Sequence, residues 1–131
     1  MILLDTCALI FDALFPEKLS AAAKKAINTA DKNNQLFCCD ISLWEIAMLV
    51  QKGRLDPRYE VSSFLKDMLN ARDTQVLAIS IEIATISTSY ANWNHFDPAD
   101  RLIAATAICH NAGLITCDKK LSDIPDLSVI W

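Results

Sequence analysis

The stretch that decides the fold is residues 97–118, which read DPADRLIAATAICHNAGLITCD. The part at 98–113 follows a helical pattern after a proline, and LITCD is a short apolar run typical of a buried strand. An acidic residue stands at each change of structure, with Asp100 near the start of the helix and Asp118 at the end of the strand. The stretch therefore predicts a helix and then a buried strand, each marked by a carboxylate.

The same alternation recurs toward the N-terminus and once more at the end of the chain. Apolar runs predict strands at 1–5, 36–40 and 76–80, and residues 127–131 are a candidate for a fifth. Helical spacing predicts helices from 6 to about 14, from 19 to about 32, at 41–53, at about 59–71 and at 82–91. Strands that alternate with helices predict a three-layer α/β/α sandwich around a mostly parallel sheet of four to five strands.

Composition sets limits on the class of protein. The 131 residues are 53% hydrophobic with a mean hydropathy of +0.25, which excludes disorder and favours one domain spanning 1–131. The five cysteines form no C-x-x-C pair, which favours buried free thiols in a reducing cytoplasm. The apolar N-terminus lacks a basic region, and no stretch is long and apolar enough to cross a membrane. We expect a cytoplasmic protein.

The net charge of -4 and pI of about 5.0 argue against a simple nucleic-acid-binding module. A nucleic-acid substrate would have to be held by local cations and a metal. Four acids are candidate ligands for such a metal, because each lies near a point where a predicted strand is followed by a helix. They are Asp5, Glu45, Asp100 and Asp118. In a parallel sheet these points share one edge. Carboxylates gathered there repel one another unless a divalent cation lies among them, so the pattern predicts a metal site.

Helix capping offers a second interpretation of each acid. Ser42-x-x-Glu45 has the spacing of a capping box, and Asp97 precedes a proline as an N-cap residue does. The negative charge of Asp100 would then interact favourably with the dipole of its helix, and Asp118 would cap a short helix. Capping does not predict that the acids share one edge, whereas a metal site does. Asp97 is interpreted as a cap that at most touches a metal-bound water.

Residues near the acids are weaker candidates for function. Thr6 and Thr116 would either hold ligands by hydrogen bonds or merely cap, and Cys7 and Cys117 are expected to be packed thiols rather than zinc ligands. Trp44 is expected to anchor its helix. The candidates for contact with a nucleic-acid substrate, each with a purely structural alternative, are Arg101 and Lys119 for phosphate, His95 for phosphate or a base, and Trp93 for base stacking.

Four segments together, LLDT, SLWEIA, DPADRLIAATA and LITCD, resemble the PIN domain family, specifically the VapC-type toxins of bacterial toxin–antitoxin pairs. The resemblance covers essentially the whole chain. It implies a three-layer α/β/α fold and a Mg²⁺- or Mn²⁺-dependent endoribonuclease. The family's acidic quartet falls on Asp5, Glu45, Asp100 and Asp118, and its two hydroxyl positions fall on Thr6 and Thr116. It also implies a homodimer and a cognate antitoxin with a DNA-binding part, which blocks the active site.

The expected mechanism uses one or two Mg²⁺ ions, with Mn²⁺ as the alternative and Asp5 as the central ligand. Water activated by the metal would attack the RNA phosphate in line and leave a 5′-phosphate and a 3′-hydroxyl. Two other functions remain open. One is a non-catalytic PIN-like interaction domain, and the weaker one is an aspartate-based phosphatase, whose D-x-D pattern is broken here by Cys7.

Overall fold

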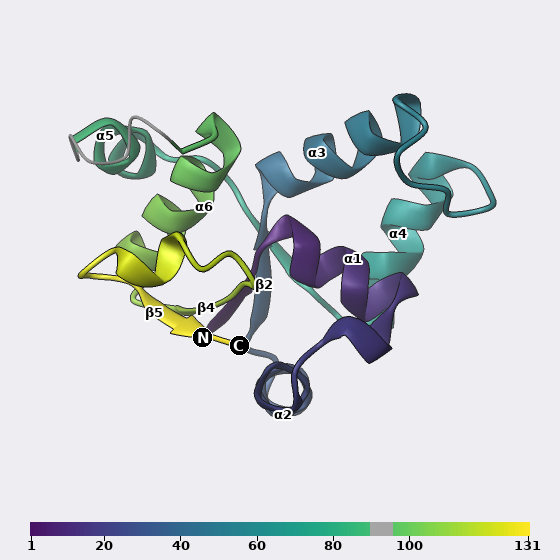
Figure 1. Cartoon of the computed structure of the whole chain (residues 1–131), viewed down its shortest axis with the longest axis horizontal. Helices are drawn as coiled ribbons and strands as arrows, with labels where there is room; N and C mark the ends of the chain where they lie inside the picture. The colour runs from purple at the N-terminus through teal and green to yellow at the C-terminus, as the bar shows by residue number, and fades with distance from the viewer. Residues whose placement is uncertain (90–95) are drawn as a thin grey trace.

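The computed structural model describes residues 1–89 and 96–131 of the chain (Figure 1). Its strands are β1 (Ile2–Leu4), β2 (Leu36–Cys39), β3 (Gln75–Leu77), β4 (Gly113–Ile115) and β5 (Ser128–Ile130). Its α-helices are α1 (Thr6–Leu14), α2 (Ala21–Lys32), α3 (Asp40–Gln51), α4 (Val61–Ala71), α5 (Ile81–Ser89) and α6 (Pro98–Cys109). Short 3₁₀ turns at Pro16–Lys18 and Leu121–Asp123 complete the described elements.

The strands form one sheet in the order β3-β2-β1-β4-β5, and every neighbouring pair is parallel. The first strand of the chain therefore lies in the middle of the sheet. Leu3 is in register with Phe37 of β2 and with Leu114 of β4, so apolar side chains lie side by side across the centre. The expected mostly parallel sheet of four to five strands is confirmed, and it is parallel throughout with five strands.

Alternate residues of the central strands enter two separate hydrophobic clusters, because successive side chains of a strand point to opposite faces. Leu3 and Leu114 pack with residues of α5 and α6, whereas Leu4 and Ile115 pack with residues of α1, α2, α3 and α4. Figure 1 shows α5 and α6 on one side of the sheet and α1, α3 and α4 on the other. Both faces are buried, which explains the runs of consecutive apolar residues in the strands.

Several expected details differ from the structure. The strands expected at 76–80 and 114–118 end earlier, at Leu77 and Ile115. Not all cysteines are buried: Cys38 and Cys39 are, but Cys7 and Cys117 are exposed, so the expectation of packed thiols is wrong for these two. In the part of the chain that the structure describes, no helix is long and apolar enough to cross a membrane.

Candidate metal centre

Asp5 connects β1 to α1 and is the most enclosed carboxylate of the sheet edge, with 8% of the residue exposed. Its backbone N–H donates to the carbonyl of Ile115 on the neighbouring strand at 3.1 Å. Its Oδ1 accepts a 2.7 Å hydrogen bond from the N–H of Ala8, so Asp5 is the N-cap of α1. Asp5 therefore both caps α1 and lies at the edge of the sheet.

The pKa of Asp5 is raised to about 6, mainly by burial and to a smaller extent by the negative charges of Glu45 and Asp118. Hydrogen bonds from Thr116 and Ala8 act in the opposite direction. The balance leaves a carboxyl group that ionises reluctantly, because the surroundings do not fully compensate its charge. This is the electrostatic condition that a cation would relieve.

Thr116 joins Asp5 to Asp118, although it is itself only 1% exposed. Its hydroxyl is hydrogen bonded to the carboxylate of Asp5, and its Oγ1 accepts the backbone N–H of Asp118 at 3.0 Å. Asp118 is half-buried, and its Oδ1 accepts the N–H of Lys120 at 3.0 Å, which closes a turn after β4. The sequence predicts that Asp118 caps a short helix, but in the structure its carboxylate closes a turn instead. This carboxylate lies at the same edge of the sheet as Asp5.

Glu45 is half-buried on α3, and Thr6 at the start of α1 donates a hydrogen bond to its Oε1. The capping-box interpretation of Ser42 and Glu45 is wrong. Helix α3 begins at Asp40, with Cys39 as its N-cap, so Ser42 lies inside the first turn and cannot cap it. The side chain of Glu45 reaches across to α1 instead. Burial raises its pKa, the hydrogen bond from Thr6 lowers it, and Asp97 raises it.

Asp100 lies in the first turn of α6, and burial raises its pKa to about 6. The charges of Glu45, Asp118, Asp97 and Asp5 contribute in that order. Asp97 occupies the N-cap position of α6 as expected, but its side chain makes no capping hydrogen bond. Its exposed carboxylate instead raises the pKa of both Glu45 and Asp100. Asp97 is therefore a fifth acid of the cluster, since its side chain does not cap the helix.

The structure thus brings Asp5, Glu45, Asp100 and Asp118 from four separate segments into one electrostatically coupled group. Among residues 1–89 and 96–131, no ion pair joins any of the four to a basic side chain. The same residues contain no set of three or more acids, cysteines or histidines already closed tightly enough to hold an ion. The carboxylates are close enough to repel one another but do not form a ready-made cage.

The donor atoms available at this edge fit a hard divalent cation. Carboxylate and hydroxyl oxygens are the ligands that Mg²⁺ and Mn²⁺ prefer. The thiols of Cys7 and Cys117 lie nearby, but desolvation and Asp5 raise the pKa of Cys7 to about 12, and desolvation raises that of Cys117. The four carboxylates and the hydroxyls of Thr6 and Thr116 outnumber these two thiols, so the donor set favours a hard cation over zinc.

The structure describes two of the four predicted substrate contacts, Arg101 and Lys119. Lys119 is exposed directly after Asp118, and Arg101 is partly exposed directly after Asp100. Trp93 and His95 lie outside the described residues. Trp44, expected to anchor its helix, is 57% exposed beside Glu45, so that expectation is wrong. It lies on the part of α3 that faces away from the two hydrophobic clusters.

Sequence reasoning missed two polar residues at this edge. Ser42 is completely buried and lies 3.0 Å from Thr6, and its position three residues before Glu45 on one helix face was the available signal. Asp40 follows β2 as Asp5 follows β1. Its Oδ2 accepts the N–H of Ile79 at 3.1 Å, while its Oδ1 is buried without a hydrogen-bond partner among the described residues. Asp40 is not among the main causes of the pKa shifts of Asp5, Glu45 and Asp100.

Comparison with known proteins agrees with this architecture. The PIN domain family matches residues 2–127. The chain is 34% identical over 120 residues to Ribonuclease VapC22 of Mycobacterium tuberculosis, which covers 92% of this chain and 88% of that protein. The chain belongs to the PIN domain family. The family expected from its four sequence segments is confirmed.

Solved structures share the fold at lower sequence identity. A chain of VapBC2 from Rickettsia felis, bound to a DNA fragment from its promoter, has a TM-score of 0.76 at 23% identity and covers 98% of this chain and 97% of its own. A toxin–antitoxin complex from Klebsiella pneumoniae has a TM-score of 0.64 at 21% identity, covering 97% and 95%. FitAcB from Neisseria gonorrhoeae has a TM-score of 0.63 at 23% identity, covering 98% and 96%. These confirm the expected α/β fold.

Proposed function

We propose that this protein is a metal-dependent endoribonuclease and the toxin of a type II toxin–antitoxin pair, built as one PIN-like domain over residues 1–131. The observation that carries the proposal is the coupled carboxylate group at the carboxyl edge of the sheet, which has no basic partner among the described residues. The relative named as a ribonuclease, at 34% identity over nearly the whole chain, supports RNA as the substrate.

The proposed ligands of the cation are Asp5, Glu45, Asp100 and Asp118. Asp5 is the central one because it is the most buried and is electrostatically coupled to all three of the others. The cation is Mg²⁺ or Mn²⁺, with one or two ions bound, and it would activate water and neutralise charge on the phosphate. An acidic protein needs such local neutralisation to accept an anionic strand.

Two hydroxyls hold these ligands in place. Thr116 fixes Asp5 by its side chain and Asp118 by that residue's main chain, so two ligands move together. Thr6 holds one oxygen of Glu45 and leaves the other free. Asp97 is proposed to support the site through its charge beside Glu45 and Asp100. The chain therefore supplies an oriented set of oxygen donors before any substrate arrives.

Contacts with the RNA are proposed for residues that flank the ligands. Arg101 and Lys119 each directly follow a ligand, and neither forms an ion pair among the described residues, so both are available to a phosphate. His95 and Trp93 are proposed as weaker contacts to a phosphate or a base. All four lie close in sequence to Asp100 or Asp118, which favours contact near the scissile bond.

The proposed partners are a cognate antitoxin with a DNA-binding part and a second copy of this chain, and the proposed location is the cytoplasm. The support is the set of solved neighbours, which includes a toxin–antitoxin complex and a VapBC2 complex bound to promoter DNA. Because those neighbours share 21–23% identity, they support the fold directly and the partnership only by analogy.

The test is cleavage of RNA by the purified chain with Mg²⁺, with Mn²⁺ and with excess chelator. We expect cleavage that needs the divalent ion and leaves 5′-phosphate and 3′-hydroxyl ends. Products that end in a 2′,3′-cyclic phosphate would contradict attack by water. The variant Asp123→Asn is a control that should cleave RNA like the natural sequence, since it removes an exposed carboxylate from the Leu121–Asp123 turn, outside the proposed site.

A non-catalytic interaction domain is the alternative outcome of a separate measurement. If the acids served only as caps, added Mg²⁺ or Mn²⁺ would leave the melting temperature unchanged. A bound cation instead raises it with concentration, because the ion binds the folded state alone. Unchanged melting together with no cleavage would favour the interaction domain.

A further inference from the structure

Ser42 lies on the turn of α3 that precedes Glu45, and it is 0% exposed. Residues three apart lie on the same face of a helix, so both side chains face α1. The Ser42 hydroxyl lies 3.0 Å from Oγ1 of Thr6, which is itself hydrogen bonded to Oε1 of Glu45. The three side chains form a continuous chain of hydrogen bonds from the interior to the carboxylate.

The direction of this chain follows from the number of hydrogens. Each hydroxyl has one hydrogen to donate, and an ionised carboxylate can only accept. Thr6 therefore donates its hydrogen to Glu45, and its oxygen accepts the hydrogen of Ser42. Linked hydroxyls of this kind polarise one another, so the outer bond is strengthened by the inner one.

We infer that Ser42 is a positioning residue for the proposed metal site: it fixes the hydroxyl of Thr6, which holds one oxygen of Glu45 and leaves the other free for a divalent cation. The inference rests on the proposed function. It deepens that function by assigning a task to a buried residue that touches neither the cation nor the substrate.

Two observations favour positioning over an ordinary structural task. Helix α3 begins at Asp40 with Cys39 as its N-cap, so the hydroxyl of Ser42 is not needed to cap the helix. Glu45 is also the ligand most in need of restraint. It has a long side chain, and it lies near the like charges of Asp97 and Asp100, which would push it away from the group.

The first test measures the affinity of the full chain for Mn²⁺ by calorimetry, without RNA. Ser42→Ala is expected to weaken Mn²⁺ binding about tenfold, the lower end of what loss of a group behind a metal ligand costs. In cleavage assays its kcat should fall at low Mg²⁺ and recover at high Mg²⁺, while KM for RNA stays unchanged. Mn²⁺ affinity equal to that of the natural sequence would overturn the inference.

A double-mutant cycle tests whether Ser42 acts through Thr6. Thr6→Val removes the intermediate hydroxyl, and Ser42→Ala is then expected to cause no further loss of Mn²⁺ affinity. A further full tenfold loss in that background would mean that Ser42 acts by another route, and the inference would fall.

Ser87→Ala is the matched control. Ser87 is 6% exposed on α5, and its hydroxyl donates to the carbonyl of Ala84 at 2.7 Å, so the variant also deletes one buried hydroxyl. Its Mn²⁺ affinity should match that of the natural sequence. An equal loss in Ser87→Ala would show that both variants act through general destabilisation, against the inference.

Ser42→Cys covers the case in which Ser42→Ala does not fold. It nearly preserves the volume at this buried position but offers only a weak donor, so we expect weakened Mn²⁺ binding in a folded protein. Full affinity in Ser42→Cys would overturn the inference. Failure of the proposed function gives a different result, because the natural sequence itself would then bind no Mn²⁺ and cleave no RNA.

Discussion

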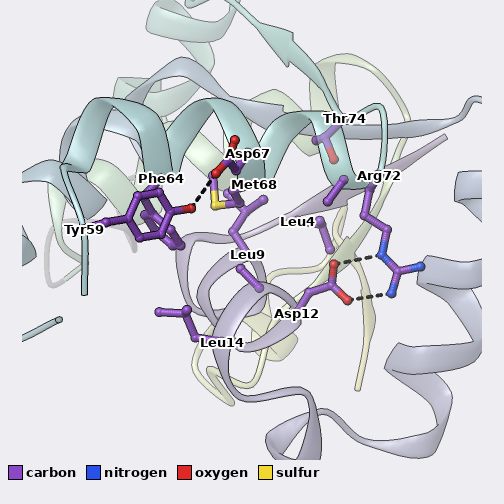
Figure 2. Close-up of a pocket in the computed structure, with 12 residues that line it drawn as sticks. Leu4, Leu9, Asp12, Leu14, Tyr59, Phe64, Asp67, Met68, Arg72 and Thr74 are labelled. Atoms are coloured by element: carbon purple, nitrogen blue, oxygen red, sulfur yellow. Dashed lines mark hydrogen bonds and ion pairs between the residues drawn. The ribbon is translucent and has the colours of Figure 1, made fainter. Parts of the chain in front are cut away.

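Helix α1 has an acid at each end, and the two acids have opposite surroundings. Asp12, in its last turn, receives two hydrogen bonds from Arg72, at 3.0 Å from Nε and 2.8 Å from Nη2 (Figure 2). Arg72 also reaches Asp31 at 3.3 Å. Asp5, at the N-terminus of α1, has the three other acids of the quartet as its charged neighbours.

The difference separates a structural acid, Asp12, from Asp5, which we propose to be functional. Arg72 neutralises Asp12 beside a pocket of about 270 Å³ between α1 and α4, where Leu9, Phe64 and Met68 supply apolar walls. At the other end of the helix, charge is left uncompensated by the described residues, and the pKa values rise. Perturbed carboxyl groups gathered at one edge are typical of functional sites, whereas paired ones are typical of structural links.

Asp5→Asn tests the comparison at its most sensitive point. The amide can still cap α1, so the fold should be retained, while RNA cleavage should fall by at least about a thousandfold because the central anionic ligand is lost. Cleavage rates with saturating Mg²⁺ check this. A variant that retains full activity would contradict the proposed mechanism.

Stability should depend on pH through Asp5. Its pKa is about 6 in the folded state and 3.8 in the unfolded reference, so the folded state binds more protons in between. Without metal, the contribution of Asp5 to the free energy of unfolding should therefore be greatest below pH 4, fall by about 3 kcal/mol as pH rises to about 6, and then level off. Urea unfolding in the presence of chelator measures the free energy of unfolding at each pH, and this free energy should depend less on pH in Asp5→Asn. A profile identical to that of Asp5→Asn would count against the raised pKa.

Divalent ions should reverse that loss. At neutral pH, Mg²⁺ at a hundredfold excess over its dissociation constant should stabilise the natural sequence by about 2.7 kcal/mol. Thermal unfolding across a Mg²⁺ series measures the effect, and Asp5→Asn should lose most of it. Equal stabilisation of both proteins would place the ion elsewhere.

Arg72→Met should show the opposite pattern. Removing the guanidinium leaves Asp12 unpaired in a site where only 11% of its side chain is exposed, so stability should fall by about 2 kcal/mol. Activity per folded molecule should be unchanged, because Arg72 does not contact the acidic edge. Urea unfolding and cleavage rates measured together separate the two effects, and a loss of activity in the folded variant would break the comparison.

Lys119→Ala should give the smallest effect. Loss of one phosphate contact should raise KM for RNA about threefold and reduce the slope of its salt dependence by about one. Lys24→Ala is the control, since Lys24 is exposed on α2, a helix that contributes none of the proposed site residues. Equal changes in both variants would indicate general charge rather than a specific contact.

The sheet and the meeting of the acids could be predicted because each follows from local pattern. Leu3 and Leu4 are consecutive apolar residues, which is enough to indicate a strand buried on both faces, and parallel strands bring Asp5 and Asp118 to one edge. The link from Asp12 to Arg72 could not be predicted, because 60 residues separate them and neither forms part of a recognisable pattern.

Ser42 shows a different limit of sequence reasoning. Ser-x-x-Glu is compatible with a capping box and with a hydrogen-bond chain to another helix, and the choice depends on where α3 begins. A capping box with Ser42 as N-cap needs the helix to begin at residue 43, whereas α3 begins at Asp40, three residues earlier. The exposure of Trp44 was missed for a related reason, since an aromatic residue in a helical pattern does not reveal which face it occupies.

The position of β1 in the middle of the sheet has a consequence for biosynthesis. Strands β1, β2 and β3 are synthesised first and adjoin one another, whereas β4 and β5 are added to the free side of β1 last. A nascent chain that has completed β3 already contains Asp5 and Glu45, but Asp100 and Asp118 have not yet been translated. A ribosome making this protein therefore carries an incomplete carboxylate group until translation is nearly over, and the proposed site cannot form before Asp118 is added.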